Sequence, residues 1–342
     1  MKRIGNLYEK IISLGNLRLA DEKARRGKKD TYGVRLFDKD REHNLLALHD
    51  ALLTKTFRTS PYDVFTIHEP KERVIYRLPY YPDRIVHHAI MNVLGPIWER
   101  TFTHNTYSCI KGRGISACAR HVEGVIRKYR GKPLYCLKID IRKFYPSVDH
   151  DVMKRIVRRK IKDADLLRLL DGIIDSAPGL PIGNYLSQYL ANLYFAYFMH
   201  KANEGLKLDC EEYADDICFY ADDKERLHEA FHTAIRPYIE QGLRLRVKGN
   251  WQVFPIADNR HDRHGRALDF VGYRFYRRQK LLRKDIKQNM CRKAARLNKR
   301  QPTVGARAYK QAIAPWLGWA RHCNSKNLLK KTIKEEYYEG IL

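Results

Sequence analysis

Near the middle of the chain, two adjacent aspartates, Asp215 and Asp216, interrupt a run of residues that otherwise favours β-strand. The run extends from Glu211 to Tyr220 and reads EEYADDICFY, so strand-forming residues lie on both sides of the acidic pair. Aspartates disfavour strands and favour turns, which predicts a β-hairpin over about residues 209–221 with the pair at its tip. Two anions held side by side repel each other, so this arrangement indicates a site for a hard cation such as Mg²⁺.

Basic residues greatly outnumber acidic ones in this chain. There are 66 lysines and arginines against 39 aspartates and glutamates, which gives a net charge of +27 over 342 residues. The positive charge is spread along the chain and interleaved with 22 tyrosines. This pattern favours a nucleic acid over an anionic membrane as the partner.

Two further features of composition indicate where the protein acts. The seven cysteines are scattered without CxxC pairs, which predicts reduced thiols in a cytoplasmic protein. The uncharged stretch 176–199 is long enough to cross a bilayer, but it contains prolines, glycines and amides. We therefore expect a loop followed by a buried helix there, and no membrane partner.

Hydrophobic periodicity predicts helices and strands that alternate along the chain. Helices are expected over about 1–58, 83–99 with Asp83 as N-cap, 150–176, 185–204, 223–241 and 283–300, and strands over about 134–141, 243–248 and 268–275. The order strand, helix, helix, hairpin, helix, strand indicates an α+β fold.

Asp140, at the end of the predicted strand 134–141, is a candidate partner for the hairpin aspartates. Nucleotidyl transfer by two metal ions requires about three carboxylates, and the third should come from a neighbouring strand. An aspartate doublet alone is weak evidence, because such a pair is more often a solvated turn. A second doublet, Asp222 and Asp223, lies where a strand passes into a helix, so we assign it to helix capping.

Over about residues 62–280 the chain resembles reverse transcriptases in the order of its motifs. The matching segments are Asp83 to Val86, Ser108 to Gly114, Asp140, Gly183 with Ser187, Tyr213 to Asp216, and Phe270 to Tyr273. The resemblance implies a right-hand polymerase whose palm is an antiparallel sheet with helices on one face. It implies a basic helical extension at 1–60, fingers at 61–133 with part of 176–190 near the palm, a palm at 134–275, and a short basic helical thumb at 276–342.

The same resemblance implies roles for individual residues. Asp140, Asp215 and Asp216 would be catalytic and, with the backbone carbonyl of Ile141, would bind two Mg²⁺ ions, for which Mn²⁺ could substitute. Residues implied to bind the deoxynucleoside triphosphate are Lys71, Arg73, Arg77, Tyr145, Ile182, Gly183 and Gln188, with the Tyr145 ring excluding a 2′-hydroxyl. Residues implied to bind nucleic acid are Lys111, Arg113, Gly272, Arg283, Lys284, Arg292 and Lys293.

Two other groups of residues have alternative interpretations. Trp316 and Trp319 would either pack in the helical core, which their spacing favours, or join the thumb surface. The polar loop from His261 to His264 contains potential metal ligands but no supporting ones nearby, so we do not expect a metal there.

Ile182 and Gln188 stand where most reverse transcriptases carry glutamine and proline, and this double change resembles the enzymes of diversity-generating retroelements. Those enzymes copy a template RNA with errors concentrated at adenines. An apolar residue beside the nucleotide discriminates less than a polar one. The resemblance implies a template RNA, an RNA/cDNA hybrid and a small basic oligomeric accessory protein as partners. The alternatives are a reverse transcriptase of another bacterial type, associated with introns, retrons or defence, and a catalytically idle RNA-binding scaffold.

Overall fold

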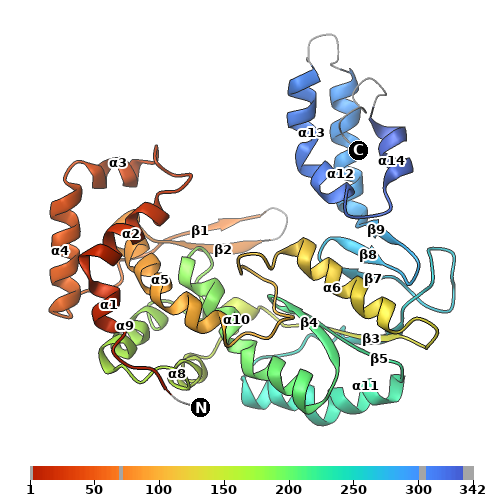
Figure 1. The fold of residues 1–342 in the computed structure, drawn as a ribbon, viewed down its shortest axis with the longest axis horizontal. Coiled ribbons are helices and arrows are strands. Elements are labelled where there is room, and N and C mark those ends of the chain that lie inside the picture. The colour runs from red at the N-terminus through yellow and green to blue at the C-terminus, as the bar shows by residue number, and fades with distance from the viewer. Residues whose placement is uncertain (1–2, 69–71, 300–305, 334–342) are drawn as a thin grey trace.

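A computed structural model describes residues 3–68, 72–299 and 306–333. Helices at the N-terminal end are followed by a two-stranded hairpin, a four-stranded sheet with its helices, and a three-stranded sheet that leads into further helices (Figure 1). All strand pairs in these sheets are antiparallel. The predicted α+β class, with an antiparallel sheet and packed helices, is confirmed.

The N-terminal helices are α1 (Tyr8–Ile12), α2 (Leu14–Ala24), α3 (Tyr32–Asp38) and α4 (Arg41–Leu53), as the helical pattern predicts. The leucines at positions 45, 48 and 52 of α4 are buried in the main hydrophobic core. In α2, Leu17 and Ala20 are buried in the same core, against which α5 (Ile85–Glu99) packs.

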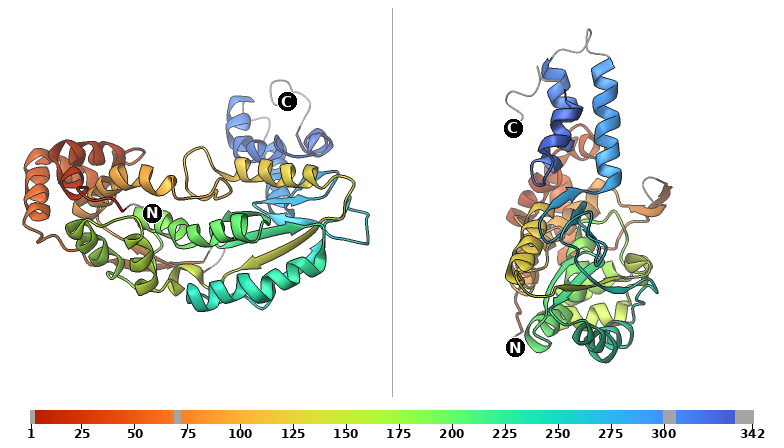
Figure 2. Two further views of the ribbon diagram at one scale, coloured as in Figure 1. Left: turned by 60° about the horizontal axis from the view of Figure 1, so that its bottom comes forward. Right: turned by 90° about the vertical axis from the view of Figure 1, so that its right-hand side faces the viewer.

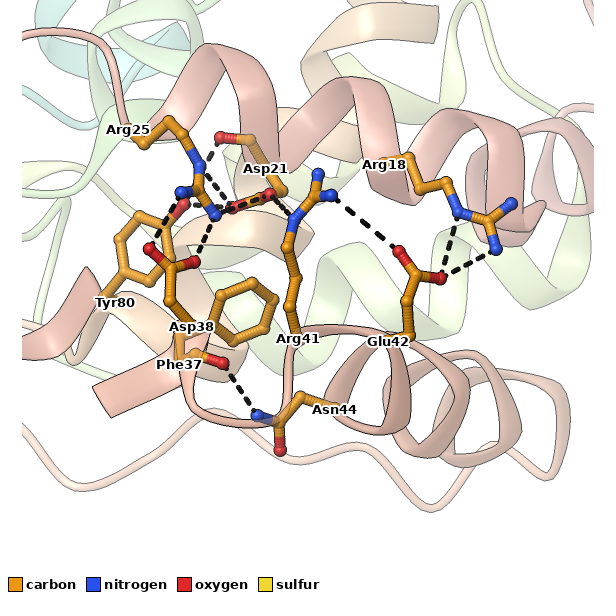
Figure 3. A network of polar contacts seen from close by, with 9 residues as sticks. All are labelled: Arg18, Asp21, Arg25, Phe37, Asp38, Arg41, Glu42, Asn44 and Tyr80. Carbon is orange, nitrogen blue, oxygen red and sulfur yellow. Dashed lines mark hydrogen bonds and ion pairs between the residues drawn. The ribbon is translucent and has the colours of Figure 1, made fainter. Parts of the chain in front are cut away.

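A buried carboxylate, that of Asp21 in α2, joins these helices (Figure 3). Arg25 Nη2 and Arg41 Nε each lie 2.8 Å from its oxygens, and the Tyr80 hydroxyl also donates to it. Arg25 also pairs with Asp38 at 2.8 Å. Because Tyr80 begins the turn η1 (Tyr80–Arg84) that leads into α5, this network fixes α2, α3 and α4 to the segment after the hairpin.

The hairpin consists of β1 (Asp63–Ile67) and β2 (Arg73–Arg77), with Asp63 opposite Arg77. It extends from the body of the molecule, and several of its apolar side chains, including Val64, are exposed (Figure 1). The prediction that Asp83 caps the following helix is wrong. The helix begins at Ile85, and the buried Asp83 carboxylate instead accepts a hydrogen bond from the Ser60 backbone N–H at 3.0 Å.

The central sheet has the strand order β4-β5-β3-β6. Side chains alternate across it: Leu137 and Ile139 join the core with α10, whereas Cys136 packs on the other side with α6. Figure 2 shows α6 and α11 on opposite sides of this sheet. The bounds are β3 (Tyr135–Asp140), β4 (Asp209–Tyr213), β5 (Asp216–Ala221), β6 (Gln252–Pro255), α6 (Ile115–Lys128), α7 (Phe144–Ser147), α8 (His150–Arg158), α9 (Ala164–Ile174), α10 (Tyr185–His200) and α11 (Lys224–Ala230).

The predicted hairpin at 209–221 is present as β4 and β5, and the Asp223 side chain caps α11, as expected, by accepting from Glu225 N at 3.0 Å. After α11, the chain continues through two π-helical turns, η3 (Phe231–Ile235) and η4 (Tyr238–Gly242). An equivalent turn, η2 (Lys201–Gly205), follows α10. Helical structure therefore extends over most of the predicted segment 223–241.

The strand predicted at 243–248 is wrong. Backbone N–H groups of Leu243 and Leu245 donate to Tyr238 and Ile239, at the end of the preceding helical segment, and only Val247 forms a β-bridge, to Ile141. The alternating leucines are buried in the main hydrophobic core without pairing in a strand. The fourth strand is β6, further along the chain.

The segment predicted as a strand at 268–275 is a hairpin, β7 (Leu268–Phe270) and β8 (Tyr273–Phe275). Val271 and Gly272 form its turn with φ of 40° and 82°. A side chain on Gly272 would come within 2.4 Å of the Trp319 ring. The structure therefore gives the buried Gly272 a packing role.

The C-terminal helices follow β9 (Lys280–Leu282) and are α12 (Lys284–Lys299), α13 (Ala306–Ala320) and α14 (Lys326–Thr332). The basic helix predicted at 283–300 is present as α12. Trp319 packs on Tyr273, with ring centroids 5.4 Å apart, as its helical spacing indicated. The uncharged stretch 176–199 forms a turn and the buried helix α10, and none of the helices described is long and apolar enough to cross a membrane.

The Asp21 network predicts a large loss of stability on mutation. In Asp21→Ala, two guanidinium groups and the Tyr80 hydroxyl lose a buried acceptor, and we expect a loss of about 3–5 kcal/mol in the free energy of unfolding. Denaturant unfolding would measure it. The control is Glu42→Ala, which removes the exposed ion pairs with Arg18 and Arg41 but leaves the buried Asp21 acceptor in place, and should cost far less. Equal effects of the two substitutions would contradict this account.

Candidate active site

The three aspartates predicted to be catalytic come together at one end of the central sheet. Asp140 is the last residue of β3 and lies directly opposite Asp216, the first residue of β5. Asp215 precedes it in the turn after β4, where Ala214 adopts a φ of 57°. Antiparallel pairing thus brings Asp140 and Asp216, 76 positions apart in the chain, to opposing positions in the ladder.

The surroundings of these carboxyl groups favour a positive ion between them. Burial raises the pKa of Asp215, and the charges of Asp216 and Asp140 raise it further. Burial also raises the pKa of Asp216, which Lys138 counteracts. Oδ1 of Asp140 is buried and has no hydrogen-bond partner among the described residues. A bound cation would relieve both the repulsion and this unsatisfied oxygen.

Two lysines that the sequence reasoning missed contact these aspartates. Lys248 Nζ lies 2.5 Å from Asp140 Oδ2, and its backbone N–H donates to the Asp140 carbonyl at 2.9 Å. Lys138 Nζ lies 3.8 Å from Asp216 Oδ1 and donates to the Asp269 carbonyl at 2.8 Å. Lys138 could have been found, because it precedes Asp140 by two residues and so shares its face of the strand. No spacing in the sequence relates Lys248 to Asp140 in this way.

The donor set fits a hard divalent cation, although no three acidic, histidine or cysteine side chains within the described residues are already arranged as a metal site. Asp140, Asp215 and Asp216 offer only carboxylate oxygens, which magnesium and manganese prefer. Ile141, whose carbonyl was predicted to assist, is buried and bridges to Val247 next to Asp140.

Tyr145, in α7, lies close to the aspartates. Burial raises its pKa to about 12, and the charges of Asp215 and Arg73 both act on its hydroxyl. Arg73 begins β2, so the structure brings this predicted triphosphate ligand toward the same site. The Tyr145 backbone is held in place by a hydrogen bond, because its carbonyl accepts from the Leu180 backbone N–H at 2.7 Å.

The loop of Ile182 and Gly183 packs on the β1–β2 hairpin. The Ile182 carbonyl accepts from Tyr76 N at 2.8 Å, and a side chain on Gly183 would come within 2.6 Å of the Tyr76 carbonyl. Gly183 also has a φ of 120°, which a side chain would strain. The structure therefore holds Ile182 beside the strand that carries Arg73.

The other predicted nucleotide ligands are less directly placed. Arg77 forms an ion pair with Asp63 and lies over the Phe65 ring, 5.5 Å from its centroid. Gln188 is exposed on α10. Lys71 lies outside the described residues.

The predicted nucleic-acid ligands divide into exposed and structurally engaged residues. Lys111, Lys284 and Arg292 are exposed, and Lys293 is half-buried on α12. Arg113 braces its own loop by donating to the Thr103 carbonyl at 2.7 Å. Arg283 Nε donates to Asp269 Oδ1 at 2.6 Å, and its charge also acts on Asp216. Lys284 and Asp140 line one open hollow of about 540 Å³ between the sheet and α12.

Comparison with known families agrees with this arrangement. Residues 68–249, more than half of the chain, match the family described as reverse transcriptase (RNA-dependent DNA polymerase). The chain belongs to this family. The matched segment contains Asp140, Asp215, Asp216 and both lysines that contact them.

Two proteins are similar to this chain in sequence. It is 27% identical over 284 residues to Protein YkfC of Escherichia coli strain K12, which covers 69% of this chain and 72% of that protein. It is 26% identical over 93 residues to Nuclear intron maturase 1, mitochondrial, of Arabidopsis thaliana, which covers 27% of this chain and 12% of that protein.

Solved structures with some likeness include yeast telomerases. Apo telomerase from Candida tropicalis superposes with a TM-score of 0.49 at 11% identity, covering 82% of this chain and 61% of that one. Telomerase from Candida albicans in complex with the TWJ fragment of telomeric RNA gives 0.48 at 10% identity, covering 86% and 62%. This chain thus spans less than two thirds of the length of those chains.

The contact beneath Tyr145 predicts that Gly179 cannot be replaced. Gly179 has a φ of 61°, and a side chain there would come within 2.3 Å of the Tyr145 carbonyl. We expect Gly179→Ala to cost about 1–3 kcal/mol and to weaken deoxynucleotide binding in the presence of a template–primer. Thermal unfolding and nucleotide titration would measure both effects. Gly172→Ala is the control, because it lies in α9 with open space around it and should be neutral or stabilising. Unchanged nucleotide affinity in a folded Gly179→Ala protein would contradict the role of this contact.

Proposed function

We propose that this protein is an RNA-directed DNA polymerase that uses Asp140, Asp215 and Asp216 as its catalytic carboxylates. The observation that carries the proposal is the pairing of Asp140 with Asp216 at the end of two buried strands, within a domain of the reverse transcriptase family. Three carboxylates held together at such a position are not needed by a scaffold that only binds RNA, and their mutual repulsion opposes folding.

The three aspartates and the Ile141 carbonyl would hold divalent ions, which when bound would help to activate the primer 3′-hydroxyl and to neutralise the leaving pyrophosphate. Lys248 and Lys138 orient the carboxylates of Asp140 and Asp216 through the contacts described above. They also offset part of the negative charge gathered at the site.

Residues around the aspartates would select and hold the nucleotide. Arg73 suits the triphosphate, because a guanidinium group can donate two parallel hydrogen bonds to phosphate oxygens. Tyr145 would lie against the sugar, where its ring excludes a 2′-hydroxyl and favours deoxynucleotides. The charges of Arg73 and Asp215, which both act on its hydroxyl, support this assignment.

In this proposal the parts of the chain correspond to those of a right-hand polymerase. Residues 61–133, with part of 176–190, form the fingers, 134–275 the palm and 276–342 the thumb. The contact of Ile182 with Tyr76 supports joining the 176–190 segment to the fingers hairpin. Exposed basic residues of α12, such as Arg292, would contact the backbone of the template–primer.

The aspartate assignment predicts that activity is lost when one carboxylate is replaced by an amide of the same shape. Asp215→Asn removes a charged ligand but keeps the shape, and primer extension on an RNA template should fall by orders of magnitude. Asp222→Asn is the matched control, because Asp222 is an exposed aspartate near the end of the same hairpin. If Asp215→Asn extends primers as well as Asp222→Asn does, the proposed catalytic role is wrong.

We also propose that the enzyme is of the diversity-generating type and copies its template RNA with errors at adenines. The proposal rests on Ile182 and Gln188 and is supported by the position of Ile182 beside β2, which carries Arg73. An apolar side chain there gives the incoming nucleotide no hydrogen bond that could fix its orientation. Template RNA and a small basic accessory protein would be its partners.

This proposal predicts that fidelity changes with the side chain at position 182. Ile182→Gln adds a hydrogen-bonding group worth about 1 kcal/mol, so errors opposite adenine should fall roughly fivefold. Sequencing the cDNA would measure the error spectrum, and Ile182→Leu, which stays apolar, should keep the original one. Equal error rates in both variants would remove Ile182 from the explanation while leaving the polymerase assignment intact.

A further inference from the structure

A second concentration of positive charge lies far from the aspartates, at the C-terminal end of α6. Arg127 and Arg130 from α6 and its following turn, and Arg277 and Arg278 from the turn between β8 and β9, surround one hollow of about 850 Å³. We call this hollow the arginine pocket. Asp258 is the acidic residue in its lining, so four positive charges face one negative charge.

Hydrogen bonds and ion pairs fix the shape of the arginine pocket. Arg277 Nη2 donates to the carbonyls of Tyr129 and Lys132, at 2.9 and 2.6 Å, and holds the end of α6 against the turn that carries Arg278. Asp258 lies between the two arginines of that turn, 3.4 Å from Arg277 Nε and 3.2 Å from Arg278 Nε. Arg127 and Arg130 are exposed and take part in no ion pair among the described residues. The local excess of positive charge is therefore left for an external anion.

The neighbouring loop adds to this charge. Asp262 organises the loop by accepting from the backbone N–H groups of Asp258 and His264, each at 2.8 Å. Arg260 and Arg263 remain exposed on it. This loop, between β6 and β7, and the C-terminal end of α6 lie together at the right-hand edge of Figure 1. The histidine-containing loop thus extends a basic surface.

The chemistry of the lining selects the kind of partner. Ile126 is its large apolar residue, and no aromatic ring of the described chain lines the hollow. Protein interfaces usually contain an apolar core with aromatic anchors, and single-stranded nucleic acid is usually held by stacking on aromatic rings. Arginines without such partners suit the phosphate backbone of a folded, base-paired strand, which is recognised by its shape and phosphates.

The position of the pocket separates it from the active site. The turn after α6 leads into β3 at Tyr135, and Asp140 lies at the other end of that strand, roughly 15–20 Å away. We propose that the arginine pocket binds the phosphate backbone of a folded segment of the template RNA outside the polymerase cleft. This inference deepens the proposed function, because it takes the RNA template as given.

The test compares binding of a short RNA hairpin by three forms of the full chain. The pocket variant carries Arg127→Glu, Arg130→Glu and Arg278→Glu, and leaves Arg277 in place because it holds the structure together. The control variant carries Lys10→Glu, Arg26→Glu and Lys29→Glu, which change the net charge equally at exposed positions of α1 and of the turn after α2. A milder pocket variant with glutamine at the same three arginines covers any failure of the first to fold.

We expect the pocket variants to bind the hairpin at least about tenfold more weakly than the unaltered protein. The slope of log K against log salt concentration should become shallower by about 0.7–0.9 for each phosphate contact that is lost. The control variant should lose much less. Extension of a short template–primer, which needs only the active site, should persist in both, so failure of the polymerase proposal would be seen separately.

Three results would overturn the inference. The first is an unchanged affinity for the hairpin in the folded pocket variants. The second is an equal loss of hairpin affinity in the pocket and control variants. The third is that binding of polyglutamate depends on these arginines whereas binding of the hairpin does not. The second would indicate a general effect of net charge, and the third an acidic protein as the partner.

Discussion

The register between β3 and β5 is the constraint on which the active site depends. On one face of these strands, Leu137 and Ile139 of β3 and Ile217 and Phe219 of β5 are buried in the main core. A shift of one residue would turn these side chains toward the opposite face, so their burial fixes the register. Asp140 then lies opposite Asp216 as a consequence. The hydrophobic core, and not any attraction between the acidic groups, sets the position of the carboxylates.

That arrangement has an electrostatic cost, and basic side chains from other elements reduce it. Lys248 approaches Asp140 from the segment after η4, and Lys138 approaches Asp216 from within β3. Lys138 also donates to the carbonyl of Asp269, whose carboxylate accepts from Arg283 at the start of α12. A continuous series of polar contacts therefore connects β3, which carries Asp140, with the helix proposed to bind the template–primer. Movement of that helix would therefore alter the contact between Lys138 and Asp216, through Asp269.

The elements that sequence patterns predicted correctly are those whose local chemistry and burial agree. The hairpin at 209–221, the strand ending at Asp140 and the basic helix α12 are of this kind. Leu243 and Leu245 misled the prediction because their alternation is the same whether a segment pairs in a sheet or packs on helices; only the hydrogen bonds to Tyr238 and Ile239 decide. Asp83 shows the same limit, since its partner Ser60 lies 23 residues earlier in the chain. Lys248 and the arginine pocket likewise arise from tertiary contacts that no local pattern contains.

The two ends of β3 pose opposite electrostatic problems. At Asp140 the sheet gathers negative charge that divalent ions can neutralise, whereas beyond Tyr135 the arginine pocket gathers positive charge that phosphates can neutralise. A template RNA that is single-stranded where it is copied and folded elsewhere could occupy both ends at once. Attachment at the pocket would raise the effective concentration of the template at the active site without adding any contact to the nucleotide. Template choice and nucleotide choice would then be made by different residues, so a site with few polar contacts to the nucleotide could still act on one particular RNA.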